Sequence, residues 1–122
     1  MIEFVETDET TPYTQQLRER TGPVVLVNTF TVPAGRAEEF LALWREDAAY
    51  FTRQPGFVST QMHRGIAGSR ILVNIAVWQS AAHLAAAHSN PDFRPGGEGY
   101  PQGCTVSPHL YEKVAVDGIC AA

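Results

Sequence analysis

The sequence predicts an α+β protein of the ferredoxin-like class, with the element order βαββαβ behind an N-terminal arm. Apolar, β-branched runs alternate with two segments of helical pattern in the order that this class requires. The length of 122 residues fits a single domain. We therefore divide the chain into an arm at residues 1–22, a ferredoxin-like domain at 23–117 and a C-terminal tail at 118–122.

The first strand and the first helix of the domain have clear limits. The strand is predicted at residues 24–32, where the run VVLVNTFTV lies between Pro23 and Pro33. The helix is predicted from Ala37 to Phe51, because its apolar positions recur at three- and four-residue steps. Within the arm, the stretch IEFV fits an additional edge strand.

A hairpin and a short helix are predicted next. The hairpin combines strands at residues 57–63 and 70–79 across a glycine-containing turn. Ser80 is a natural N-cap for an alanine-rich helix at residues 81–88.

The region after the second helix is predicted to be irregular before the last strand. Residues 95–103, PGGEGYPQG, are rich in glycine and proline and are typical of a loop that crosses the surface. The last strand is predicted from His109 onward, because Pro108 cannot donate a hydrogen bond to a ladder. Whether the loop closes over a ligand stays open.

The predicted sheet has an apolar face that its own helices do not cover. The strands at residues 24–32 and 70–78 are apolar on both faces, yet two helices cover only one face of the sheet. A second copy packed sheet to sheet would hide the other face. The sequence therefore predicts a homodimer, in the form of a dimeric α+β barrel. Whether the arm crosses to the partner stays open.

Composition and charge exclude several classes of function. The net charge of −4 comes without a basic stripe, which argues against nucleic acid as a partner. No apolar run approaches the roughly 20 residues that span a membrane, and the acidic N-terminus does not resemble a secretion signal, so we expect a cytoplasmic protein without a membrane partner. Cys104 and Cys120 lack metal-site spacing. His83 and His88 lie five residues apart on the second helix, which does not place them on one face, so no metal site is expected.

Two asparagines interrupt apolar strands and are the first candidates for function. Asn74 shares its strand face with Leu72, Ala76 and Trp78, and Asn28 shares its face with Leu26 and Phe30. A buried amide without a partner costs about 1–3 kcal/mol, so each asparagine either bonds backbone groups or meets a ligand. Both readings stay open at this point. Trp78 offers a flat wall and one N–H donor, which suits a planar aromatic guest.

Two further polar residues lie near the predicted strand and helix ends. His63 ends the second strand on the face of Phe57, Ser59 and Gln61. An imidazole there suits proton transfer, and a histidine that caps a turn is an equally common arrangement. Arg94 follows the second helix, where it is either a solvated surface charge or an anchor for an anionic ligand at a pocket mouth.

Three stretches, PVVLVNTFTVPAGRAEEF, YFTRQPGFVSTQMH and ILVNIAVWQS, resemble in this order the antibiotic biosynthesis monooxygenase family of small dimeric α+β barrels, over residues 23–94. The pairing of VNTFTV with VNIAVW looks most like the cofactor-independent anthrone oxygenases of aromatic polyketide pathways. Under this resemblance Asn28 falls at a first-strand asparagine, and Asn74 and Trp78 match a third-strand pair. His63 matches a second-strand histidine of some members.

The resemblance implies a monooxygenase that oxidises an anthrone or naphthacenone ring to a quinone with O₂ and without a cofactor. It implies Asn28, Asn74, Trp78 and His63 as catalytic residues. The side chains predicted to bind the substrate are Phe30, Leu72, Leu84 and Arg94.

Two other functions remain open on the same scaffold. One is a non-oxidative polyketide cyclase or a ligand-binding protein. The other is a haem-binding or haem-degrading relative, although the second helix here ends AAAHSNPDF, where those relatives carry a tryptophan followed by a haem-ligating histidine.

Overall fold

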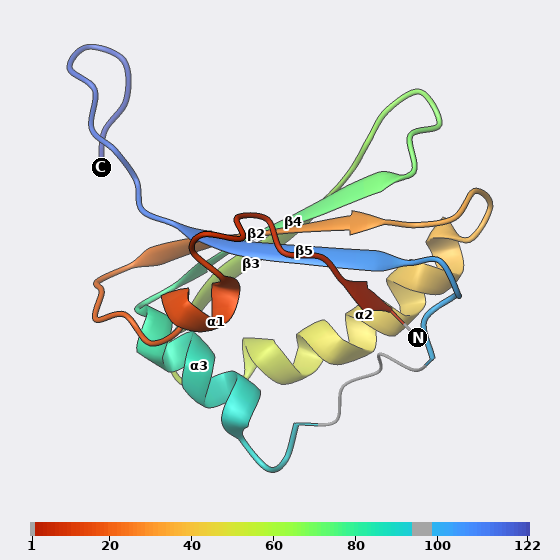
Figure 1. The fold of residues 1–122 in the computed structure, drawn as a ribbon, viewed down its shortest axis with the longest axis horizontal. Helices are drawn as coiled ribbons and strands as arrows, with labels where there is room; N and C mark the ends of the chain where they lie inside the picture. Colours follow the sequence, from red (N-terminus) through yellow and green to blue (C-terminus); the bar gives the residue numbers. More distant parts are fainter. Residues whose placement is uncertain (1, 94–98) are drawn as a thin grey trace.

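The chain forms a five-stranded sheet with its helices on one side (Figure 1). The computed structural model describes residues 2–93 and 99–122. The elements are β1 (Glu3–Phe4), α1 (Tyr13–Gln16), β2 (Val24–Thr31), α2 (Ala37–Thr52), β3 (Phe57–Arg64), β4 (Ile71–Trp78), α3 (Ala81–Ser89) and β5 (Thr105–Tyr111). The strand order is β1-β5-β2-β4-β3, and all neighbours are antiparallel except β1 and β5. From β2 to β5 this is the predicted ferredoxin-like fold.

Local sequence signals fix the ends of both long helices. Gly56, after α2, has φ of +87°, and a Cβ atom there would overlap the ring of His83, so only glycine fits. Its carbonyl accepts a hydrogen bond of 2.8 Å from the backbone N–H of Gln79. The Ser80 hydroxyl accepts from the backbone N–H of His83 at 3.1 Å, which confirms the predicted N-cap of α3.

The last strand begins earlier than predicted, because Pro108 costs it no hydrogen bond. β5 runs from Thr105, with Pro108 in its middle opposite Asn28. The backbone groups of Leu110 point away from β2, toward the side chain of Gln16. The backbone groups of residues two apart in a strand face the same strand edge. The nitrogen of Pro108 therefore also faces the free edge of β5. The expectation of a strand from His109 onward was therefore wrong.

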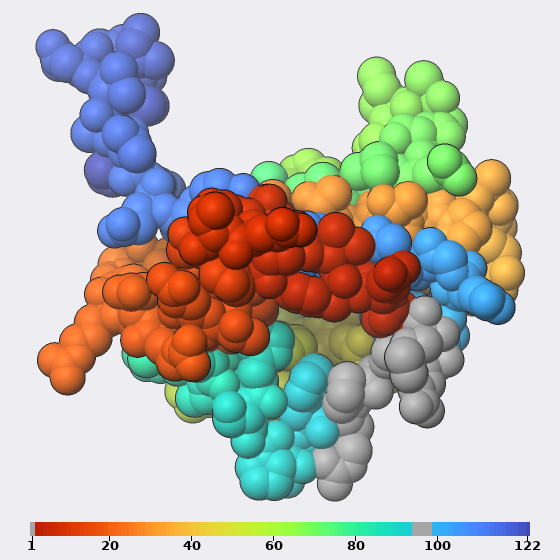
Figure 2. Space-filling view, in the orientation of Figure 1, coloured from red at the N-terminus to blue at the C-terminus, as the bar shows by residue number. Residues whose placement is uncertain are grey.

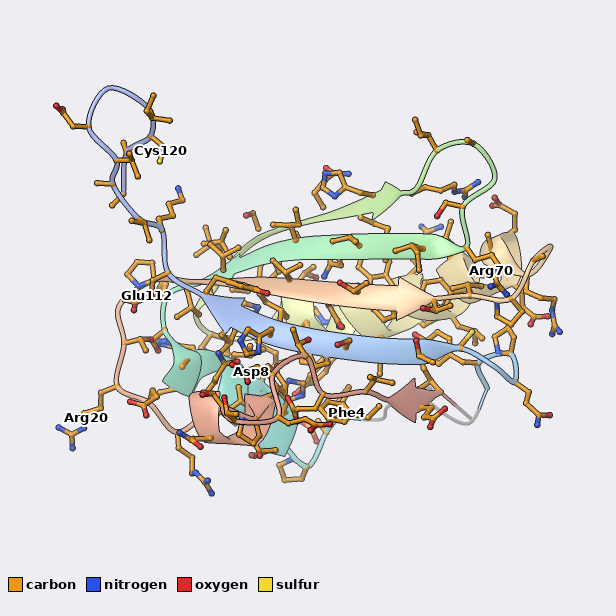
Figure 3. All side chains as sticks on the ribbon, turned by 45° about the horizontal axis from the view of Figure 1, so that its top comes forward. Phe4, Asp8, Arg20, Arg70, Glu112 and Cys120 are labelled. Carbon is orange, nitrogen blue, oxygen red and sulfur yellow. The ribbon has the colours of Figure 1, made fainter. Side chains whose placement is uncertain are left out.

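The N-terminal arm covers that free edge of β5, and Figure 3 shows Phe4 and Asp8 on the part of the arm that runs beside this strand. The predicted edge strand in IEFV is confirmed as β1, which pairs with the first half of β5. Further along, the side-chain amide of Gln16 donates to the carbonyl of Leu110 at 3.0 Å and accepts from its N–H at 2.9 Å. The arm thus provides hydrogen-bond partners for backbone groups on a strand edge that would otherwise stay unpaired. In Figure 2 it lies across the side of the molecule, between the sheet and α3.

The two faces of the sheet differ in what covers them. The inner face packs on the helices and carries buried side chains such as Leu26, Phe30 and Trp78. The outer face has no helix over it, and it leaves Val58, Ile71, Ile75 and Tyr111 exposed. The β3–β4 turn and the C-terminal tail both rise on this outer side (Figure 1). Within the described residues, no helix combines the length and apolar character needed to cross a membrane.

Candidate active site

A cavity of about 310 Å³ lies between the inner face of the sheet and the helices. This volume is at the lower end of the range of about 300–1,000 Å³ that is usual for small-molecule sites. Most of the wall is apolar or aromatic. A small set of polar side chains also reaches it: Tyr13, Asn28, Asp47, Thr60, Asn74, His88 and Tyr100.

The two asparagines face each other on the sheet wall of the cavity. Asn28 on β2 and Asn74 on β4 are direct partners in the antiparallel register. Side chains in such a pair have Cβ atoms about 4.5–5.5 Å apart, so both amides can contact one ligand edge. Asn74 is buried, with 7% of its surface exposed, and both residues line the cavity.

Each of the two amides leaves a hydrogen-bonding group unused. The Thr60 hydroxyl donates to Asn74 Oδ1 at 2.5 Å, which leaves the Asn74 NH₂ group as a donor for the cavity. The buried Oδ1 of Asn28 has no partner among the described residues and is an acceptor. A ligand with an acceptor beside a donor matches this pair.

Trp78 forms a rigid wall beside the amides. Its side chain is 2% exposed and lines the same cavity. The rings of Phe51 and Phe57 meet it edge-on, with centroid distances of 6.2 and 5.5 Å. These two ring contacts fix the indole plane, so Trp78 presents a preformed wall to the cavity.

The structure brings Phe30 and Leu84 to the cavity wall and keeps Leu72 away from it. Leu72 is 1% exposed and packs in a core cluster with Phe30 and Phe40, which fill this end of the inner face. The expectation that Leu72 contacts a ligand is therefore not met. Arg94 lies outside the described residues.

His63 lies on the outer face of the sheet and does not reach the cavity. A β-bulge between Phe57 and Ser59 shifts the alternation of β3 by one residue. Phe57 consequently faces the cavity, while His63 is exposed opposite Val73, whose carbonyl lies 3.3 Å from His63 Nδ1. The expected placement of His63 beside the substrate is corrected by this register shift.

Two hydrogen-bonded pairs in the cavity were not expected from the sequence. The hydroxyl of Tyr13 lies 3.0 Å from His88 Nε2, and the hydroxyl of Tyr100 donates to Asp47 Oδ2 at 2.7 Å. Burial raises the pKa of Tyr13 and lowers the pKa of His88. Burial, followed by the bond to the Asp47 carboxylate, raises the pKa of Tyr100.

Neither pair had a usable signal in the sequence. Tyr13 lies in a four-residue helix, too short for a periodic pattern, and in the arm outside the family resemblance. Among the described residues, no group of three or more His, Cys, Asp or Glu side chains is placed to hold a metal ion.

The fold and the cavity together define an α+β protein whose cavity suits a small, mainly apolar ligand with a few directed polar contacts. A family model described as "Antibiotic biosynthesis monooxygenase" matches residues 23–96. The chain therefore belongs to the antibiotic biosynthesis monooxygenase family, and the expectation of a monooxygenase is confirmed at the level of the family.

Individual relatives agree with this assignment. Deoxynogalonate monooxygenase of Streptomyces nogalater is 42% identical over 72 residues, a match that covers 59% of this chain and 60% of that protein, which is less than two thirds of its length. The crystal structure of SnoaB, a cofactor-independent oxygenase from the same organism, superposes with a TM-score of 0.69 and 32% identity, covering 80% of this chain and 99% of that chain. A heme-degrading protein of Mycobacterium tuberculosis is more distant, with a TM-score of 0.58 and 25% identity over 79% of this chain and 99% of that chain.

Proposed function

We propose that the protein is a cofactor-independent monooxygenase, which oxidises an anthrone- or naphthacenone-type aromatic polyketide intermediate to a quinone with O₂. The observation that carries the proposal is the facing pair of amides on the wall of an aromatic cavity, with an unused NH₂ donor on Asn74 and an unused acceptor oxygen on Asn28. The similarity to a deoxynogalonate monooxygenase and to a cofactor-independent oxygenase supports the same reaction class.

The substrate supplies the electrons for this reaction. An anthrone loses a proton from its methylene carbon because the resulting negative charge spreads over the rings and the carbonyl oxygen. The anion gives one electron to O₂, and the radical pair combines to a peroxide at the same carbon. After protonation, the hydroperoxide loses water and leaves a second carbonyl group, which completes the quinone.

The protein's part is to hold the developing negative charge and to exclude bulk water. The Asn74 NH₂ group donates to the carbonyl oxygen, where charge accumulates after the proton is lost. Asn28 Oδ1 accepts from a phenol hydroxyl beside that carbonyl. Trp78 bounds the ring plane, and the apolar walls strengthen both hydrogen bonds. This arrangement favours substrates in which a carbonyl and a hydroxyl group share one edge.

We also propose a homodimer that buries the outer face of the sheet. Ile71 and Ile75 of β4 are 38% and 39% exposed, and Tyr111 of β5 is 45% exposed on the same sheet. A second copy packed sheet to sheet would cover these side chains and leave the cavity within each subunit.

Oxygen uptake tests the proposed activity. Purified protein is mixed with dithranol, a dihydroxyanthrone whose hydroxyls flank the carbonyl, in buffer with a metal chelator and without flavin. We expect oxygen consumption above the uncatalysed rate, with one oxygen atom of ¹⁸O₂ in the quinone product. Tight binding of dithranol without oxygen uptake would instead support a ligand-binding protein. Stoichiometric binding of hemin with a Soret band would support the haem-binding alternative.

A further inference from the structure

A phenol from the arm and an imidazole from α3 meet at the helical side of the cavity. The Tyr13 hydroxyl lies 3.0 Å from His88 Nε2, and both side chains line the cavity. Tyr13 belongs to α1, ahead of residue 23, where the family match begins. The amides of Asn28 and Asn74 reach the same cavity from the sheet. The cavity therefore has a polar pair on each of two opposite sides.

We propose that Tyr13 and His88 form the proton-transfer pair of the reaction, with His88 as the base and the Tyr13 hydroxyl as the relay between it and the substrate carbon. This inference rests on the proposed function. In an anthrone, the methylene carbon and the carbonyl carbon occupy opposite corners of the central ring. A ring held at its carbonyl edge by the sheet amides turns its methylene carbon toward the helices.

The surroundings of the pair determine which atom carries which proton. Burial keeps the Tyr13 phenol protonated and the His88 ring neutral, because desolvation raises the pKa of the first and lowers the pKa of the second. Tyr13 is therefore the donor, His88 Nε2 the acceptor, and the ring proton of His88 lies on Nδ1. His88 also lies in the last turn of α3, where the helix dipole favours the positive charge that the imidazole gains.

The proton moves out and back along the same path. Tyr13 accepts the proton from the methylene carbon as its own proton passes to His88 Nε2, which leaves the substrate anion, a neutral phenol and an imidazolium. After O₂ has taken the electron and the peroxide has formed, the imidazolium returns its proton through Tyr13 to the peroxide oxygen. The hydroperoxide then loses water, and both residues are back in their starting states.

The arm is anchored so that Tyr13 keeps this position. The backbone N–H of Tyr13 donates to Glu6 Oε1 at 2.8 Å, and Gln16 bonds both backbone groups of Leu110. The rings of Phe51 and Tyr13 meet the His88 ring edge-on, at centroid distances of 5.3 and 6.0 Å. These contacts hold the two polar atoms together without a ligand.

Other titratable groups lie near the pair and have to be separated from it in a test. Asp47 of α2 and Tyr100 line the same cavity and are bonded to each other, Glu6 accepts from the backbone N–H of Tyr13, and His83 of α3 bonds to Ser80. Tyr50 of α2 offers a matched control, because its hydroxyl donates at 2.6 Å to a backbone carbonyl of α3 and its side chain does not line the cavity.

The test measures the rate of oxygen uptake with dithranol against pH for the wild type and for His88→Gln, Tyr13→Phe and Tyr50→Phe. We expect about a 10²-fold loss of kcat in His88→Gln, a typical size for a lost general base, and a loss of similar size in Tyr13→Phe, because the proton reaches His88 only through the Tyr13 hydroxyl. The double variant should lose no more than His88→Gln alone, because the two residues act as a unit. The acid limb of the wild-type profile should disappear in His88→Gln, while Tyr50→Phe behaves as the wild type.

The outcomes separate this inference from the proposed function. If the wild type consumes no oxygen, the proposed function fails, and the inference fails with it. If the wild type is active while His88→Gln and Tyr13→Phe keep its rate and its acid limb, only the proton-transfer pair is overturned. A rise in KM alone, with kcat and the pH profile unchanged, would also overturn it, because the pair would then only shape the cavity.

Discussion

The two faces of β4 differ in burial and in the kind of side chain that each carries. On the inner face Leu72, Asn74, Ala76 and Trp78 are all buried, and a polar amide lies among them. The outer face of the strand consists entirely of aliphatic side chains and stays partly exposed. An antiparallel sheet with one free face usually places polar residues on that face. This reversal supports the proposed contact of the buried amide with a ligand and the proposed contact of the open aliphatic face with a second copy.

The largest effect is expected from a variant that fills the cavity on the inner face. Ala76 lies between Asn74 and Trp78 on the cavity wall and is 3% exposed. Ala76→Phe places a ring in the space that the substrate needs, so oxygen uptake with dithranol should fall to the uncatalysed rate. Overpacking costs about 1–3 kcal/mol, and thermal unfolding will show whether the fold survives. Ile75→Leu, one residue away on the outer face, is the control and should keep full activity. A folded, fully active Ala76→Phe variant would rule out this cavity as the active site.

The outer face can be tested by placing a charge on it. Ile75→Asp introduces a carboxylate that a sheet-to-sheet contact would bury without a partner. We expect the dissociation constant of the dimer to rise by about 10²-fold or more, a change worth roughly 3 kcal/mol. Analytical ultracentrifugation over a range of concentrations measures it. Val5→Asp, at an exposed position of the arm beside the edge of β5, is the control. Identical association of wild type and Ile75→Asp would show that this face is not the dimer contact.

Loss of the Asn74 amide should lower the reaction rate less than loss of the cavity space around it. Asn74→Ala removes the donor to the carbonyl oxygen, a loss that typically costs about 10²–10³ in rate. We expect about 10- to 10²-fold in kcat, because anthrone anions already react with O₂ in solution. Trp78→Phe should cost less, since a flat ring remains. Both variants should keep the fold. Unchanged rates of quinone formation in both would remove these residues from the mechanism.

The polar partner of Asn74 provides a finer test of the same face. Thr60→Val removes the hydroxyl that fixes the Asn74 amide and keeps the side-chain shape. A lost hydrogen bond of this kind is worth about 0.5–1.5 kcal/mol, so we expect up to about a tenfold loss in kcat. Steady-state oxygen uptake measures the loss. In an Asn74→Ala background the Thr60→Val substitution should have no further effect on the rate, and an additive loss would contradict the link between the two side chains.

The sequence predicts which side chains lie on the inner face wherever the strand alternates regularly. The prediction fails where a bulge interrupts the alternation. Asn28, Asn74 and Trp78 follow a regular two-residue period, so their common face could be read from the sequence. His63 was assigned to the wrong face, because one bulge after Phe57 shifts every later residue of β3 and leaves no mark in the residue types.

Contacts between distant segments were the second limit. Tyr13 and His88 are separated by 75 positions, and only the folded arm brings them together. The anchor of that arm is Gln16, whose amide replaces a missing strand beside Leu110. A single glutamine in a polar stretch carries no such signal. Pro108 was misjudged for a related reason, since its tolerance depends on which edge of β5 its nitrogen faces.

The smallest expected effect comes from His88, which lines the cavity on the inner side of the sheet. Burial lowers the pKa of His88 below its ordinary value of 6.5, so between these two values the unfolded chain binds a proton that the folded chain does not. The free energy of unfolding should therefore fall as pH drops below about 6.5, and it should be independent of this group above that pH. We expect Tm to decrease by a few degrees more in the wild type than in His88→Gln over this range, in scans at constant ionic strength. His63→Gln, which changes an exposed histidine on the outer face, should keep the wild-type dependence. If His63→Gln flattens the profile and His88→Gln does not, the histidine that couples stability to pH lies on the outer face, and the contrast between the two faces fails on this point.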